Sequence, residues 1–169
     1  LDMSNNTIDS FSLTELKTLY TLWEKNINSP LTSSCGRLFD AVASLLNIVQ
    51  ISSYEGESGL LMESLYDSTI TEYFEFDVKN DEINFSAIIT QILNEKNNTI
   101  AISKFFNTLV QIIYEIGEKY KLPIVLGGGV FQNRVLLRLL IQKIPNIILP
   151  KEFIANDSAI AYGQAIAVV

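Results

Sequence analysis

The stretch LPIVLGGGVFQNRVLLRLL, residues 122–140, constrains the possible folds more than any other part of the chain. Residues 122–126 are apolar and rich in branched side chains, which favours a short buried strand. Residues 135–140 have helical apolar spacing and contain neither Gly nor Pro, which favours a helix. Three glycines stand between the two segments. The stretch therefore predicts a strand, a glycine turn and a helix.

The glycine turn has two interpretations. Without Cβ atoms, backbone N–H groups can approach an anion closely, and the helix that follows directs its N-terminal partial positive charge at the same place, so a phosphate would fit. Alternatively, Gly127, Gly128 and Gly129 only allow a tight strand-to-helix turn. The spacing matches neither G-x-G-x-x-G nor G-x-x-x-x-G-K-[ST], so neither a Rossmann dinucleotide site nor a Walker loop is expected.

Two later segments bear on the same site. NIILP, residues 146–150, predicts a second buried strand, and the segment from Asn156 onward predicts a final helix capped at Asn156 or Asp157. If the two strands are parallel, the glycine turn and Asp157 face one cleft at the carboxyl edge, where ligands bind in open α/β folds. Asp157 is then either a helix cap or a ligand of a hard metal ion or a magnesium–phosphate complex.

Most of the remaining chain has helical spacing. Helices are predicted for residues 12–23, 57–66 and 100–120. Two more are predicted in CGRLFDAVASLLNIV, which begins at Cys35, and from a cap at Ser86 to Leu93. Alternating residues on both sides of KNDE, residues 79–82, predict a small hairpin. The fold class expected from the residues is therefore α/β, helix-rich with few strands.

Composition excludes several classes of function. The chain has 12 basic and 19 acidic residues, a net charge of −7 and no basic run, which argues against nucleic-acid binding. It has no histidine, so histidine-dependent triads and HExxH chemistry are impossible within it. No apolar run is long enough for a membrane span and no signal pattern is present, so we expect a cytoplasmic protein. Hydrophobic residues make up 48% and charged residues only 18%, against a usual charged share of about 25%, which suggests a piece that packs on something else.

Asp40 and Cys35 are the remaining candidates outside the glycine stretch. Asp40 lies in the first turns of its predicted helix, where it either improves the helix start or accepts hydrogen bonds from two ribose hydroxyls. Cys35 is disfavoured as a nucleophile because no base is available to activate it, and a small residue at a helix start explains its presence.

Four blocks, in order, resemble one family: NSPLTSSCGRLFDAVASLLNI, YEGESG, GGGVFQNRVLL and NDSAIAYGQA, beginning at positions 28, 54, 127 and 156. They resemble the C-terminal end of the HypF family, the carbamoyltransferases of nickel–iron hydrogenase maturation. The resemblance implies the C-terminal lobe of an ASKHA domain, the actin-like ATPase and ribonuclease H-like architecture. Residues 1–169 are then a single domain fragment, the C-terminal part of a TsaD-like carbamoyltransferase domain.

The resemblance also implies a reaction. The family uses ATP and carbamoyl phosphate, makes carbamoyl-adenylate in an upstream YrdC-like domain, and moves the carbamoyl group onto the C-terminal cysteine of HypE for the cyanide ligands of the hydrogenase. HypE and the upstream HypF domains are the implied partners. The lobe would hold and orient the adenylate while a thiolate attacks. The chain alone is expected to be inactive.

Individual roles follow from the resemblance as well. Nucleotide-binding positions are implied at Gly36, Asp40, Glu63, Gly128, Gly129 and Asn133. The two loop glycines and the asparagine would contact phosphate, the two carboxylates the ribose, and Gly36 the adjacent loop. Asp157 would complete a site for a divalent metal (Fe, Zn or Mg) whose other ligands are histidines of the missing upstream lobe.

The chain departs from the family pattern in places. The family often has Phe-His where this chain has Phe105 and Phe106, and TsaD-like proteins have Asp-Asn where it has Asn156 and Asp157, so either of these two could face the metal. Two other classes of function stay open at this point. One is a TsaD-like or sugar-kinase-like enzyme of the same superfamily, and the other is a non-catalytic interaction module that docks through an apolar surface.

Overall fold

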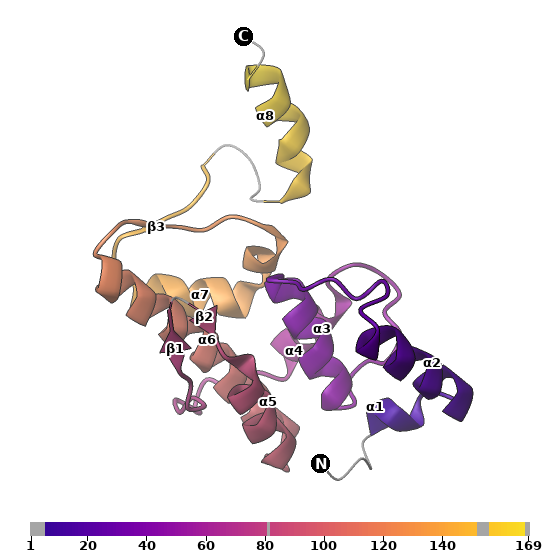
Figure 1. The fold of residues 1–169 in the computed structure, drawn as a ribbon. Coiled ribbons are helices and arrows are strands. Elements are labelled where there is room, and N and C mark those ends of the chain that lie inside the picture. The colour runs from indigo at the N-terminus through magenta and orange to yellow at the C-terminus, as the bar shows by residue number, and fades with distance from the viewer. Residues whose placement is uncertain (1–5, 81, 152–155, 168–169) are drawn as a thin grey trace. The chain divides into compact units, whose positions relative to one another are not determined.

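The computed structural model describes residues 6–80, 82–151 and 156–167. Helices dominate these residues and the strands are only two residues long, so the predicted helix-rich α/β class with few strands is confirmed (Figure 1). The chain divides into two compact units, Leu1–Gly59 and Leu60–Val169, and helix α4, Glu57–Ser64, runs across the boundary. Each unit is described separately below.

The first unit contains α1 (Asn6–Asp9), α2 (Leu13–Glu24) and α3 (Cys35–Leu45). Helix α2 begins where its sequence predicts, because Ser12 and Glu15 form a capping box: the Ser12 hydroxyl accepts from the Glu15 N–H while the Glu15 carboxylate accepts from the Ser12 N–H. The Thr7 hydroxyl donates to the carbonyl of Ser44 at 2.8 Å, which ties α1 to α3.

The two longer helices of this unit differ in burial. Helix α3 buries Phe39, Val42 and Ala43, which lie on one face at helical spacing. Helix α2 has no buried residue, and Leu13 and Trp23 are exposed apolar side chains on it. Part of the apolar surface that the composition suggested is therefore found on α2.

The core of the second unit is α6, Asn98–Tyr120, a 23-residue helix in which nine residues are buried. Asn97 caps it by accepting from two backbone N–H groups, so the helix starts two residues before the predicted Ile100. Phe105 and Phe106 have 0% exposure, and the Tyr66 ring meets the Phe106 ring edge-on at 5.7 Å.

The predicted hairpin is much shorter than its apolar pattern suggests. Strands β1 (Val78–Lys79) and β2 (Glu82–Ile83) pair antiparallel over two residues each. The preceding residues do not join the ladder because helices take their N–H groups: Phe74 donates to the hydroxyl of Thr108 and Glu75 to the side chain of Gln91. Tertiary hydrogen bonds thus replace the strand pairing that alternation favours.

Helix α5, Phe85–Asn94, also differs from its prediction at one end. The cap is Asn84, whose side-chain oxygen accepts from the Ser86 N–H at 3.0 Å, so the prediction of Ser86 as the cap is wrong. Asn favours a cap at least as strongly as Ser, and here it lies two residues earlier. The predicted end at Leu93 lies one residue before the observed end.

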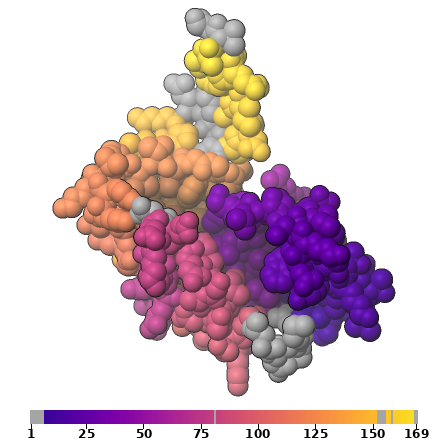
Figure 2. Space-filling view, in the orientation of Figure 1, coloured from indigo at the N-terminus to yellow at the C-terminus, as the bar shows by residue number. Residues whose placement is uncertain are grey.

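The glycine stretch folds as a strand, a turn and a helix. Strand β3 (Ile124–Val125) is followed by the 3₁₀ helix η1 (Gly129–Gln132), helix α7 (Arg134–Lys143) and strand β4 (Ile147–Ile148). Strands β3 and β4 pair in parallel, as predicted, with Ile124 opposite Ile147. In Figure 2 the glycine stretch is part of the orange segment, which is visible on the face shown.

The chain ends with the 3₁₀ helix η2 (Asp157–Ala159) and helix α8 (Ile160–Ala167). The N–H of Ala159 donates to the carbonyl of Asn156, so a 3₁₀ turn opens where an α-helix cap was predicted, and α8 begins at Ile160, four residues after Asn156. Among the described helices, none is both long and apolar enough to cross a membrane.

Candidate functional site

Gly127, Gly128 and Gly129, here called the glycine loop, connect β3 to η1. Gly128 has a φ of +102°, a conformation that L side chains rarely adopt, so the turn itself requires glycine there. The other two have no such φ. A Cβ built on Gly127 would meet nothing within 4 Å, and one on Gly129 would meet only Nε2 of Gln132, at 3.9 Å. Neither backbone conformation nor packing against the described residues therefore demands glycine at these two positions.

The backbone N–H groups of the glycine loop are available to an outside acceptor. All three glycines are exposed, and within residues 6–80, 82–151 and 156–167 none of their N–H groups donates a hydrogen bond. Backbone N–H groups are strong donors, and successive ones in a turn form anion-binding concavities. The loop consequently offers a row of donors at the carboxyl end of β3.

Asn133 joins this loop to α7. Its side-chain oxygen accepts from the N–H of Leu136 at 2.9 Å, which makes it the helix cap. Its backbone N–H donates to the carbonyl of Val130 at 3.1 Å, and the N–H of Phe131 donates to the carbonyl of Gly128 at 3.2 Å. The glycine loop, η1 and the start of α7 are therefore joined to one another by hydrogen bonds. The predicted contact of Asn133 with phosphate stays a prediction.

Glu63 reaches the same helix start from a distant part of the sequence. It is half-buried on α4, and its Oε2 accepts from the backbone N–H of Arg134 at 2.8 Å, although the two residues are 71 positions apart. Four of the six predicted nucleotide-binding residues thus belong to one region of the second unit: Glu63, Gly128, Gly129 and Asn133.

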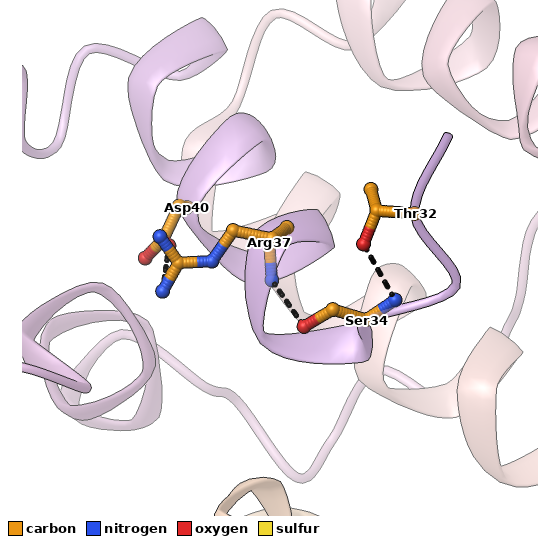
Figure 3. Close-up of polar contacts among 4 residues, drawn as sticks. All are labelled: Thr32, Ser34, Arg37 and Asp40. Carbon is orange, nitrogen blue, oxygen red and sulfur yellow. Dashed lines mark hydrogen bonds and ion pairs between the residues drawn. The ribbon is translucent and has the colours of Figure 1, made fainter. Parts of the chain in front are cut away.

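Gly36 and Asp40 belong to the first unit, where they lie in the first turns of α3. Ser34 caps this helix, with its hydroxyl 3.4 Å from the N–H of Arg37 (Figure 3). Asp40 forms an ion pair with Arg37, with Nη2 and Oδ2 3.1 Å apart, and its side chain is 34% exposed. Gly36 is half-buried. Asp40 is therefore a partly solvated carboxylate whose partner lies on its own helix.

Cys35 is the first residue of α3 and is half-buried. Burial raises the pKa of its thiol to about 11, because the uncharged form is favoured away from water. The nucleophilic species is the thiolate, which is scarce at neutral pH with such a pKa. This agrees with the interpretation of Cys35 as a structural residue.

Asp157 is exposed at the start of η2. In the part of the chain that the structure describes, no group of three or more His, Cys, Asp or Glu side chains could hold a metal ion. The residues present do not form a metal centre by themselves, so the predicted role of Asp157 requires ligands from elsewhere and stays a prediction.

The sequence alone did not indicate the role of the Arg134 N–H group or its distant acceptor. Position 134 directly follows the cap, and the first N–H groups of any helix lack intrahelical partners, so a need for an acceptor could have been recognised. Which residue meets that need depends on tertiary structure.

The fold and the site together define a structural class, a helix-rich α/β lobe with a glycine loop at the carboxyl end of a parallel strand. Residues 2–164 match the family described as carbamoyltransferase, Kae1-like domain, second subdomain. The chain therefore belongs to the HypF carbamoyltransferase family, as the second subdomain of its Kae1-like domain, and the resemblance noted in the sequence is confirmed.

Individual relatives agree with this assignment. The carbamoyltransferase HypF of Synechocystis sp. is 35% identical over 164 residues, which cover 89% of this chain and 21% of that protein. The chain thus spans about a fifth of the length of this curated relative. A crystal structure of full-length HypF in the phosphate- and nucleotide-bound form matches with a TM-score of 0.85 and 31% identity, over 96% of this chain and 24% of that one. T. kodakarensis HypF, 24% identical, shares the fold, with a TM-score of 0.73 over 94% of this chain and 22% of its own.

Proposed function

We propose that this lobe binds the phosphate of ATP and of carbamoyl-adenylate on its glycine loop, as part of a cytoplasmic HypF carbamoyltransferase. The observation that carries the proposal is the glycine loop itself. Within the described residues its N–H groups donate no hydrogen bond, and no neighbour or backbone conformation there requires glycine at Gly127 or Gly129. An anion that must approach the backbone closely explains both facts.

Charge and comparison support the same proposal. With a net charge of −7, the chain offers no general attraction to an anion, so binding must come from local donors such as these N–H groups and the N-terminal end of α7. A similar protein, full-length HypF, has been crystallised in a phosphate- and nucleotide-bound form. That similarity is a reason to test nucleotide binding in this lobe.

The remaining chemistry follows from family membership. Adenylation of the carbamoyl group makes AMP a good leaving group, and the thiolate of the C-terminal cysteine of HypE attacks the carbamoyl carbon. This lobe contributes holding and orientation of the adenylate, with Asn133 at the phosphate, Asp40 at the ribose and Gly36 beside it. A divalent metal (Fe, Zn or Mg) would be held by Asp157 together with histidines of an upstream lobe. The chain by itself then transfers no carbamoyl group, since it has no histidine to complete that site.

Gly129→Ala in the full-length protein tests the proposal. The added methyl group has room in the chain, so the fold should survive, but it should hold the phosphate off the N–H groups. Gly163→Ala is the control, because it is also a Gly-to-Ala change with room for the Cβ, which meets nothing within 4 Å, and the residue lies in α8, away from the glycine loop in the sequence. Gly128→Ala is unsuitable, since its φ would strain the turn with or without a ligand.

Calorimetric titration with ATP is the measurement. An adenylate-forming domain of the same protein would also bind ATP, so two binding events are expected. The affinity of each event is measured separately. We expect Gly129→Ala to weaken one event about tenfold, a loss of about 1.4 kcal/mol, and Gly163→Ala to change neither. If both events keep their affinity in Gly129→Ala, the glycines serve only the turn, and a non-catalytic interaction module becomes the better account of the lobe.

A further inference from the structure

The contact between Glu63 and Arg134 places a carboxylate at a helix start that is proposed to face phosphate. The first four N–H groups of a helix have no intrahelical acceptor. In α7, Glu63 accepts from the N–H of Arg134 at 2.8 Å and Asn133 accepts from that of Leu136 at 2.9 Å. Two donors of the first turn are therefore already used by side chains of the protein.

A carboxylate is well suited to hold this helix start. It is favoured there by the partial positive charge of the helix N-terminus, and a hydrogen bond from N–H to an ionised oxygen is stronger than one between neutral groups. The same negative charge repels a phosphate from the N–H of Arg134. An anion that binds nearby is consequently directed to the N–H groups of the glycine loop, which are not used within the described residues.

Hydrogen bonds connect Glu63 to the glycine loop. Arg134 directly follows Asn133, whose N–H donates to the carbonyl of Val130, and the N–H of Phe131 in turn donates to the carbonyl of Gly128. This short series of contacts reaches the glycine loop at the carbonyl of Gly128 and thereby restrains the peptide plane between Gly128 and Gly129. Loss of the Glu63 contact would release the start of α7 and, with it, the orientation of the donors.

We propose that Glu63 is a positioning residue for phosphate binding and does not contact the ribose. Its carboxylate fixes the start of α7 from α4, and this fixes the glycine loop. The proposal rests on the phosphate site proposed above and replaces the ribose contact that family resemblance implies for Glu63. It predicts that loss of the acceptor oxygen weakens ATP binding, whereas loss of the negative charge alone does not.

Two substitutions separate the acceptor from the charge. Glu63→Ala removes the acceptor, whereas Glu63→Gln keeps a side-chain oxygen that can accept from Arg134 and removes the negative charge. Glu57→Ala is the matched control, because Glu57 is on the same helix and its carboxylate also accepts from a backbone N–H, that of nearby Ser53. All three are made in the full-length protein and titrated with ATP and with adenosine.

The expected result is selective for phosphate. Glu63→Ala should weaken ATP binding at the affected site about tenfold and leave adenosine affinity within about twofold, whereas Glu63→Gln and Glu57→Ala should bind ATP like the wild type or tighter. Amide hydrogen exchange without nucleotide should be faster at the start of α7 in Glu63→Ala only, which reports the lost contact independently of binding.

Two outcomes would overturn the proposal. One is unchanged ATP affinity in Glu63→Ala, and the other is an equal loss of ATP and adenosine affinity in both Glu63 variants, which would make Glu63 a ribose ligand. Failure of the phosphate site itself is recognised separately: in that case Gly129→Ala also leaves ATP binding unchanged. A normal effect of Gly129→Ala with no effect of Glu63→Ala rejects only the positioning role.

Discussion

Helices α3 and α7 both begin with a side-chain cap near a candidate carboxylate, but they are held in different ways. At α3, the contacts are local: Ser34 accepts from Arg37 and Arg37 pairs with Asp40, each three residues apart. At α7, Glu63 arrives from 71 positions away, and the glycine loop in front of the helix keeps N–H groups that no described residue accepts from. The α3 start is held by neighbouring residues, whereas the α7 start is also held from a distant helix and follows a loop whose N–H groups can meet a ligand.

The two carboxylates differ in what a ligand would have to displace. Asp40 is paired with an exposed arginine, and exposed ion pairs contribute about 0 to 1 kcal/mol, so Asp40 can exchange its partner at little cost. Glu63 is half-buried and holds a backbone N–H that has no other acceptor in the helix. We therefore propose direct ligand contact for Asp40 and a supporting role for Glu63, and the predictions below test this division.

The largest effect is expected for Asp40→Ala. Loss of one charged acceptor for the ribose hydroxyls should cost about 1.5 to 3 kcal/mol, roughly ten- to a hundredfold in ATP affinity, while the fold is retained. Calorimetric titration of the full-length protein measures it. Asp77→Ala is the control, because Asp77 is likewise an aspartate in an ion pair with a nearby residue, Lys79. Wild-type ATP affinity in Asp40→Ala would leave Asp40 as a helix-start residue only.

Features that depend on neighbouring residues were predictable from the sequence. Helix α6 follows from its long apolar periodicity, and the parallel strands on either side of α7 follow from two short branched segments separated by a helix. The apolar face of α3 and its start at Cys35 were likewise apparent. In each case the local signal and the tertiary structure favour the same conformation.

Features that depend on distant contacts were not predictable. The alternating segment before β1 was expected to pair as a strand, but Thr108 and Gln91 take its N–H groups from two helices. The partner of the Arg134 N–H could not be read from residues near position 134, since Glu63 precedes it by 71 positions. For the candidate site, the family resemblance supplied the predicted residues, and the fold shows that Glu63, Gly128, Gly129 and Asn133 belong to one region.

Removal of the side-chain caps of α7 and α3 should have a smaller effect than Asp40→Ala, and the free-energy cost should differ between the two helices. Asn133→Ala removes a part-buried hydrogen bond of 2.9 Å, and Ser34→Ala removes an exposed one of 3.4 Å. Cap removal typically costs about 1 kcal/mol, so we expect about that value at α7 and about half of it at α3. Hydrogen exchange of each first turn, without nucleotide, measures the local opening free energies. A larger cost at α3 than at α7 would reverse the comparison.

The smallest effect is expected for Arg37→Ala. The arginine side chain is 63% exposed, so loss of its ion pair with Asp40 should change the opening free energy of α3 by less than about 0.5 kcal/mol. If Asp40 must leave Arg37 to accept from a ribose, the substitution removes that competition, and ATP affinity should stay the same or rise by up to about threefold. Titration of Arg37→Ala beside Asp40→Ala separates the two members of the pair. A fall in ATP affinity comparable to that of Asp40→Ala would instead mean that the nucleotide recognises the ion pair as a unit, and α3 would then depend on its local contacts for binding just as α7 depends on its distant one.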